Sequence, residues 1–228
     1  KMEALDEQLT AFKRSIIGYS NDIIPKMRGE MHSEVTEALS ALRQASNDII
    51  DSGSSKDEWS RRLRNSINSI QSILEKSIRD IYKSKTDDFR HRIELKRNDL
   101  DKIESLRFEC PKFDIDINID LSGVLDELTL DIGEILGSFW DGFTNPIRTL
   151  FKLPKDSQDG RTGAKRKVSA EIQKSKQLIT KEVDAVIADV DRMVRKKTNS
   201  LCNSIESERK NISALKQEFE KLNREFNC

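Results

Sequence analysis

Apolar side chains recur at steps of three and four residues over most of the chain, and this spacing places them on one face of an α-helix. The first series runs through residues 5–49 and contains Pro25. A proline ring has no N–H to donate, so we expect either one kinked helix or two stacked helices there. A second series fills residues 59–103 without Gly or Pro, and a third fills residues 168–226. The sequence therefore predicts three long helical runs.

The pairing of these helices follows from their length and their narrow apolar face. Ser55 and Glu58 form a capping box, which starts the second helix. A single helix would leave its apolar stripe in water, so a stripe sustained over this length requires a helical partner. We therefore predict an all-α fold, an elongated antiparallel helical bundle or coiled coil. Its helical stalk regions are expected at residues 1–109 and 164–228, joined by a partly extended tip at residues 110–163.

The tip begins with a different pattern. Residues 113–121 alternate strictly between apolar and polar side chains, which is the period of a β-strand. The alternation puts Asp114, Asp116, Asn118 and Asp120 on the face opposite the apolar side chains. A lone strand is unstable, and no second strand follows with equal clarity. A paired strand and an extended segment lying along the helices are both compatible with the sequence.

Short helices are predicted in the rest of the tip. Ser122 is placed to cap the first of them, and a tight turn is expected to follow at residues 140–143. Asn145 followed by Pro146 is a start signal for a second short helix, because proline suits the first helical position. We expect a polar loop at residues 155–163 to lead into the last long helix.

The charge of the chain is balanced overall but unevenly distributed. With 40 basic and 40 acidic residues, the net charge of zero implies no global attraction to nucleic acid or to an acidic membrane. The chain is 36% hydrophobic and 35% charged, which is typical of long helices that bury a narrow stripe. Residues 101–141 hold eleven acids and three bases, whereas residues 146–176 hold nine bases and three acids. We therefore expect an acidic limb of the tip to face a basic one.

The cysteines and the chain ends help to predict the cellular compartment of the protein. Cys110, Cys202 and Cys228 are too few and too scattered for a disulfide framework, so we expect a reduced, cytoplasmic protein. The amino end is charged from Lys1 onward and does not resemble a signal peptide. Charges interrupt the most apolar stretch, so no membrane-spanning helix is expected. The helical pattern at both ends leads us to expect a piece of a larger protein.

No arrangement of residues predicts catalysis, a cofactor or a metal. The glycines of the tip lack the spacing and the Lys-Ser/Thr end of a phosphate-binding loop, so we expect no nucleotide binding by that route. His32 and His91 stand alone within helical runs, where surface or packing roles are expected. The acidic alternation lacks the Gly and Glu of an EF-hand, which favours a solvated face over a calcium site. We expect no enzyme activity from this chain.

Two features of the tip suggest a contact surface. Four of the eleven Phe and Trp residues fall within thirteen positions, at Phe139, Trp140, Phe143 and Phe151. They either fill the space where the helices end or contact a membrane or partner, because exposed aromatics beside bases suit the interfacial region of a bilayer. The bases at residues 161–167 form either a patch for lipid headgroups or nucleic acid, or a solvated helix start.

The order of these segments resembles the trunk and tip of bacterial dynamin-like GTPases. A proline-containing helix and a long helix precede an acidic alternating segment, an aromatic hairpin with glycines, a basic loop and a long returning helix. The resemblance covers essentially the whole chain. It implies a membrane-remodelling protein whose GTPase domain lies in other sequence, with a trunk that transmits the change and a tip that engages lipid. The contact residues it implies are Phe139, Trp140, Phe143, Ile147, Leu150, Phe151, Arg148, Lys152, Lys155, Arg161, Lys165, Arg166 and Lys167.

The resemblance also implies partners and a location. These are an anionic membrane surface for the tip, self-association or another helical chain for the stalk, no nucleic acid, and a peripheral membrane location. Two other classes stay open. An α-helical pore-forming toxin also carries an apolar hairpin, but that hairpin should be largely uncharged, whereas this one holds Glu134, Asp141 and Arg148. In a structural coiled-coil scaffold the tip would be only a folded connector.

Overall fold

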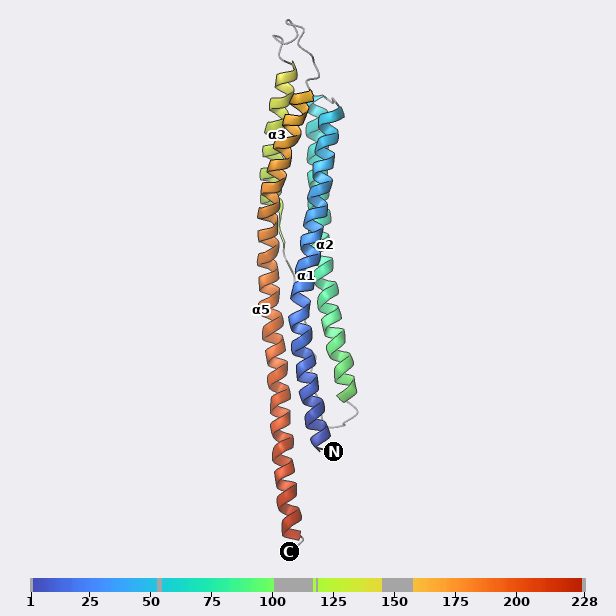
Figure 1. The fold of residues 1–228 in the computed structure, drawn as a ribbon, viewed down its shortest axis with the longest axis vertical. Coiled ribbons are helices and arrows are strands. Elements are labelled where there is room, and N and C mark those ends of the chain that lie inside the picture. Colours follow the sequence, from blue (N-terminus) through green and yellow to red (C-terminus); the bar gives the residue numbers. More distant parts are fainter. Residues whose placement is uncertain (1, 53–54, 101–116, 118, 145–157, 227–228) are drawn as a thin grey trace. The chain divides into compact units, whose positions relative to one another are not determined.

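The fold is known from a computed structural model that describes residues 2–52, 55–100, 117, 119–144 and 158–226. These residues form the helices α1 Met2–Ser52, α2 Lys56–Leu100, α3 Ser122–Thr144 and α5 Gln158–Phe226 (Figure 1). No strand occurs within the described ranges. The predicted all-α helical bundle is therefore confirmed.

The chain forms two compact units, and each combines segments that are far apart in the sequence. Unit 1 consists of Lys1–Arg28, Tyr82–Asp116 and Ile187–Cys228, and unit 2 of Gly29–Ile81 and Ile117–Val186. It follows that α1, α2 and α5 contribute to both units, whereas α3 belongs to unit 2.

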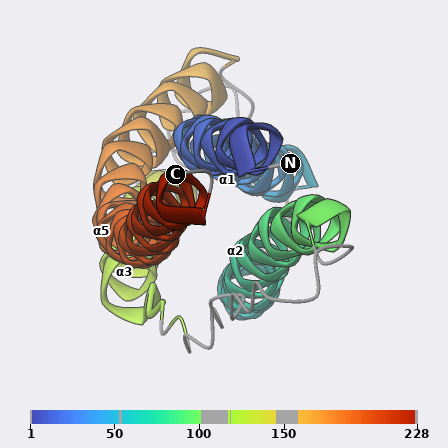
Figure 2. The ribbon, with the colours of Figure 1, turned by 90° about the horizontal axis from the view of Figure 1, so that it is seen from below.

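Unit 1 is built, in its described part, from segments of α1, α2 and α5, which Figure 2 views from their ends. Glu3 of α1 pairs with Lys216 of α5, and Lys13 pairs with Glu206, so partner numbers fall as α1 proceeds. The two helices are therefore antiparallel. The predicted apolar seams form the core, where burial of each side chain contributes about 1.5–3 kcal/mol. Its buried members include Leu9, Phe12, Ile16, Phe89, Ile93, Val190, Val194, Leu201 and Ile205.

Unit 2 has α3 packed beside segments of the three long helices. His32 of α1 contacts Asp184 of α5, and Asp51 at the end of α1 contacts Lys165 near the start of α5, so these two helices are antiparallel here too. Four side chains of the apolar face of α3 are fully buried in this core. The buried side chains of unit 2 include Met31, Val35, Leu42, Leu63, Leu74, Leu125, Leu128, Ile132, Leu136, Val168 and Ile179.

The predicted start of the second helix agrees with the structure, and the first helix ends at Ser52, close to its predicted end. Of the two alternatives at Pro25, the structure has one continuous helix. Asn21, whose carbonyl loses its helical donor to the proline, lies with Pro25 on the exposed face, where water can replace the missing N–H. At the start of α2, Ser55 Oγ accepts from the backbone N–H of Glu58 at 3.4 Å. The serine half of the capping box is therefore present.

The alternating segment before α3 lies with its apolar side inward. Ile117, Ile119 and Leu121 are buried, and Asp120 is exposed, as the alternation predicts. These residues form neither strand nor helix. The described positions thus have the predicted inward and outward sides but are not part of a strand, and the other positions, residues 113–116 and 118, lie outside the described ranges.

The cap of α3 differs from the one predicted. The backbone N–H of Ser122 donates to Asp120 Oδ1 at 2.9 Å, so Asp120 rather than Ser122 supplies the capping oxygen. The Leu121 N–H donates to Glu75 Oε1 of α2 at 3.3 Å. Asp120 lies two residues before Ser122, the first residue of α3, which is why its carboxylate reaches the unpaired N–H of Ser122.

Two predicted irregular segments are helical. The tight turn expected at residues 140–143 is wrong, because α3 continues through these residues to Thr144. The polar loop expected to reach residue 163 is wrong from residue 158 onward, because α5 already begins at Gln158. Contacts between the start of α5 and α1 outweigh the weak helix propensity of its glycines. The predicted short helix at Asn145 and Pro146 lies outside the described residues.

Candidate functional site

The described aromatic side chains of the predicted tip lie on the last turns of α3. The rings of Phe139 and Trp140 meet edge to face, with centroids 5.6 Å apart and planes at 66°. Both side chains are half-buried, and they follow the fully buried Leu136 by three and four residues. The pair therefore sits at the edge of the apolar stripe, where both residues are half-buried and the indole nitrogen of Trp140 is itself buried. This position is compatible with both roles proposed for them from the sequence.

Two of the predicted headgroup-binding bases contact the end of α1. Lys165 Nζ lies 2.6 Å from Asp51 Oδ2, and Arg161 Nη1 donates to the Asp51 carbonyl at 3.5 Å. The last turn of α1 has no base of its own. The carbonyls at a helix end are unpaired and carry partial negative charge, so cations there are stabilising. In this structure Lys165 and Arg161 of α5 supply them.

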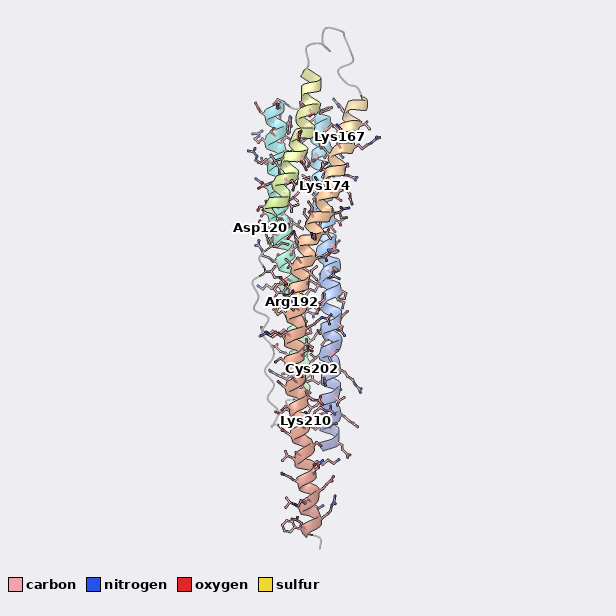
Figure 3. All side chains as sticks on the ribbon, turned by 90° about the vertical axis from the view of Figure 1, so that its left-hand side faces the viewer. Asp120, Lys167, Lys174, Arg192, Cys202 and Lys210 are labelled. Carbon is pink, nitrogen blue, oxygen red and sulfur yellow. The ribbon has the colours of Figure 1, made fainter. Side chains whose placement is uncertain are left out.

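Arg166 and Lys167 are the exposed members of the basic cluster. Neither forms an ion pair within the described part of the chain, and Lys167 projects outward from α5 (Figure 3). These two side chains are available to a partner.

The register of α3 against α5 brings the aromatic pair and these bases to one level. Asp131 lies 3.6 Å from Lys174. Trp140 is nine residues further along α3, and Lys165 is nine residues back along α5. Because both helices rise by about 1.5 Å per residue, the last turn of α3 is level with residues 165–167 of the antiparallel α5.

The other predicted contact residues cannot be placed in the same way. Phe143 belongs to α3, but its side chain lies outside the described part. The remaining predicted contacts also lie outside the described residues: Ile147, Arg148, Leu150, Phe151, Lys152 and Lys155.

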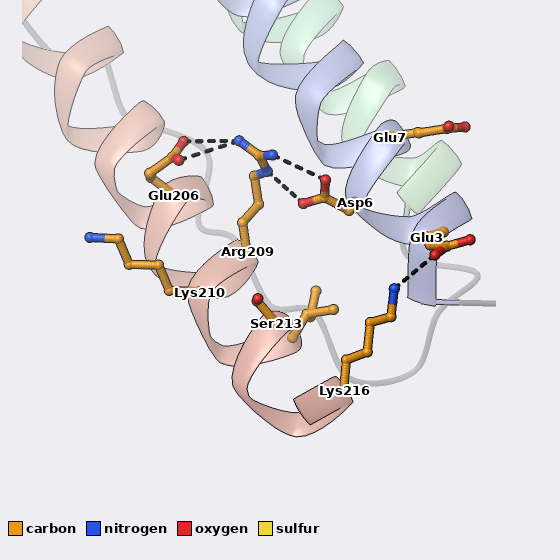
Figure 4. Close-up of a pocket in the computed structure, with 9 residues that line it drawn as sticks. Glu3, Asp6, Glu7, Glu206, Arg209, Lys210, Ser213 and Lys216 are labelled. Carbon is orange, nitrogen blue, oxygen red and sulfur yellow. Dashed lines mark hydrogen bonds and ion pairs between the residues drawn. The ribbon is translucent and has the colours of Figure 1, made fainter. Parts of the chain in front are cut away.

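An ionic cluster in unit 1 was not anticipated from the sequence. Between the first turns of α1 and the end of α5 lies an open cleft of about 430 Å³ (Figure 4). In it Arg209 bridges Asp6 and Glu206, at 2.7 Å and 3.3 Å, and Lys216 binds Glu3 at 2.7 Å. The acids on α1 and the bases on α5 predict this cluster only when the two helices are aligned antiparallel, residue by residue.

The charges of this cluster neutralise one another. The hydrogen bond from Arg209 lowers the pKa of Asp6, and the hydrogen bond from Lys13 lowers the pKa of Glu206. The hydrogen bond to Asp6 raises the pKa of Arg209 in turn. Pairs of this kind between two helices select their partner and register. The cleft is therefore a register contact between α1 and α5, in which Glu3, Asp6, Glu206, Arg209 and Lys216 are paired with one another.

The side chains with reactive potential have structural surroundings. His32 Nε2 lies 3.1 Å from Asp184 Oδ1, an interhelical pair in unit 2. Burial raises the pKa of the Cys202 thiol, which keeps it protonated and a poor nucleophile. Across the described ranges, no three His, Cys, Asp or Glu side chains are grouped to hold a metal ion. None of the helices within those ranges combines the length and the apolar character needed to cross a bilayer.

Comparison of the chain with protein-family models, with curated proteins and with solved structures finds no match.

Proposed function

We propose that this chain is the helical stalk and membrane-contacting tip of a bacterial dynamin-like membrane-remodelling protein, non-catalytic by itself. The tip would bind an anionic membrane surface from the cytoplasmic side. The stalk would associate with a second copy or with another helical chain. GTP hydrolysis would belong to sequence outside this chain.

This proposal rests on the antiparallel register of α3 and α5 in unit 2. The register places Phe139 and Trp140 of α3 at the same height along the helices as Arg166 and Lys167 of α5. Half-exposed aromatic rings and free bases at one level are the two components of interfacial membrane binding. Each base near an anionic surface contributes about 1 kcal/mol. A fully buried aromatic side chain contributes about 1.5–3 kcal/mol, and these half-exposed rings would contribute less. The described residues therefore support reversible attachment, which several copies together would strengthen.

Co-sedimentation with vesicles tests the proposal. The wild-type chain should sediment with phosphatidylserine-containing vesicles and much less with phosphatidylcholine vesicles, and added salt should release it. The F139S/W140S and R166E/K167E variants should each lose most of this binding while keeping their helicity by circular dichroism.

A matched control is available on the same helix. The R192E/K196E variant makes the same change of charge at two exposed positions of α5 in unit 1. It should bind vesicles as the wild type does. Undetectable wild-type binding, together with early melting of F139S/W140S, would assign the aromatic pair to the core and favour the scaffold alternative.

The scaffold alternative has a specific observation of its own. The end of α5 in unit 1 carries a row of exposed large apolar side chains. Such a row on a helix is typical of a protein contact.

A further inference from the structure

We draw no further inference here: the strongest candidate, the row of exposed apolar side chains at the end of α5 in unit 1 (Leu215, Phe219, Leu222 and Phe226), is a helix face for which nothing in the described part of the chain shows what covers it.

Discussion

Arg209 of α5 binds both carboxylate oxygens of Asp6 of α1, with Nε 2.7 Å from one oxygen and Nη2 3.0 Å from the other. Forked pairs of this kind require a defined geometry, so they favour one register of the two helices over its neighbours. Arg209 also donates to Glu206 on its own helix. The guanidinium thus joins the start of α1 to the end of α5 in unit 1.

The cluster around Arg209 predicts a dependence of stability on pH. Asp6 and Glu206 have pKa values lowered in the folded state from the ordinary 3.8 and 4.5. The folded state therefore holds their protons less tightly than the unfolded state, so their stabilisation is present above these ordinary values. It is lost as the pH falls through the lowered pKa values.

The Asp6→Asn variant isolates this contribution. At pH 7 it should be less stable than the wild type in urea unfolding, because Arg209 loses a charged acceptor. The difference between the two proteins should shrink as the pH is lowered from about 5 to about 3, where Asp6 itself becomes protonated. A difference that stays constant over this range would show that the carboxylate charge at Asp6 contributes nothing.

Two leucines of α3 should respond very differently to truncation. Leu136 is fully buried in the core of unit 2, whereas Leu130 is 73% exposed. Leu136→Ala should lower the free energy of unfolding by about 2–5 kcal/mol, because it removes a packed side chain and leaves a cavity. Leu130→Ala should change it by less than about 0.5 kcal/mol. Urea unfolding followed by circular dichroism measures both, and equal losses would contradict the assigned face of α3.

The helical seams could be predicted from the sequence because burial and helix period act on the same residues. In α5 the apolar positions from Val168 to Ile205 repeat every three or four residues, and in the structure most of them are buried, although Ile187 rather than Val186 is the buried residue at its step. The same logic gave the inward side of Ile117, Ile119 and Leu121.

The missed features depend on contacts between residues far apart in the sequence. Gly160 and Gly163 favour a loop locally, but Arg161 and Lys165 meet the end of α1 and the helix extends through them. The aromatic stretch ending α3 contains a glycine pattern typical of a turn, yet the core contact of Leu136 continues the helix past it. The bridge from Arg209 to Asp6 needs the antiparallel register before it can be seen at all.

The sequence also predicts the result of a nucleotide-binding test. No glycine-rich segment of this chain has the spacing or the Lys-Ser/Thr end of a phosphate-binding loop. Calorimetric titration of the chain with GTP and Mg²⁺ should give no saturable heat, and incubation with GTP should release no phosphate. Stoichiometric, Mg²⁺-dependent binding would contradict both this expectation and the assignment of GTP hydrolysis to other sequence.

The two tryptophans give a direct readout of the proposed membrane contact. Trp59 is buried in unit 2 at 4% exposure, whereas Trp140 is half-buried beside Phe139. In the Trp59→Phe variant, Trp140 is the only indole. Its emission should shift to shorter wavelength when phosphatidylserine-containing vesicles are added, because the ring would leave water for the interfacial region of the bilayer.

The converse variant is the control for this measurement. In Trp140→Phe the only indole is the buried Trp59, and vesicles should leave its emission unchanged. Adding R166E/K167E to the Trp59→Phe chain should raise the lipid concentration needed for the shift at least about tenfold, since two bases near an anionic surface contribute about 1 kcal/mol each. An unshifted Trp140 that vesicles also fail to protect from acrylamide quenching would mean that the end of α3 does not enter lipid. The aromatic pair would then be part of the packing of unit 2, and the scaffold alternative would stand.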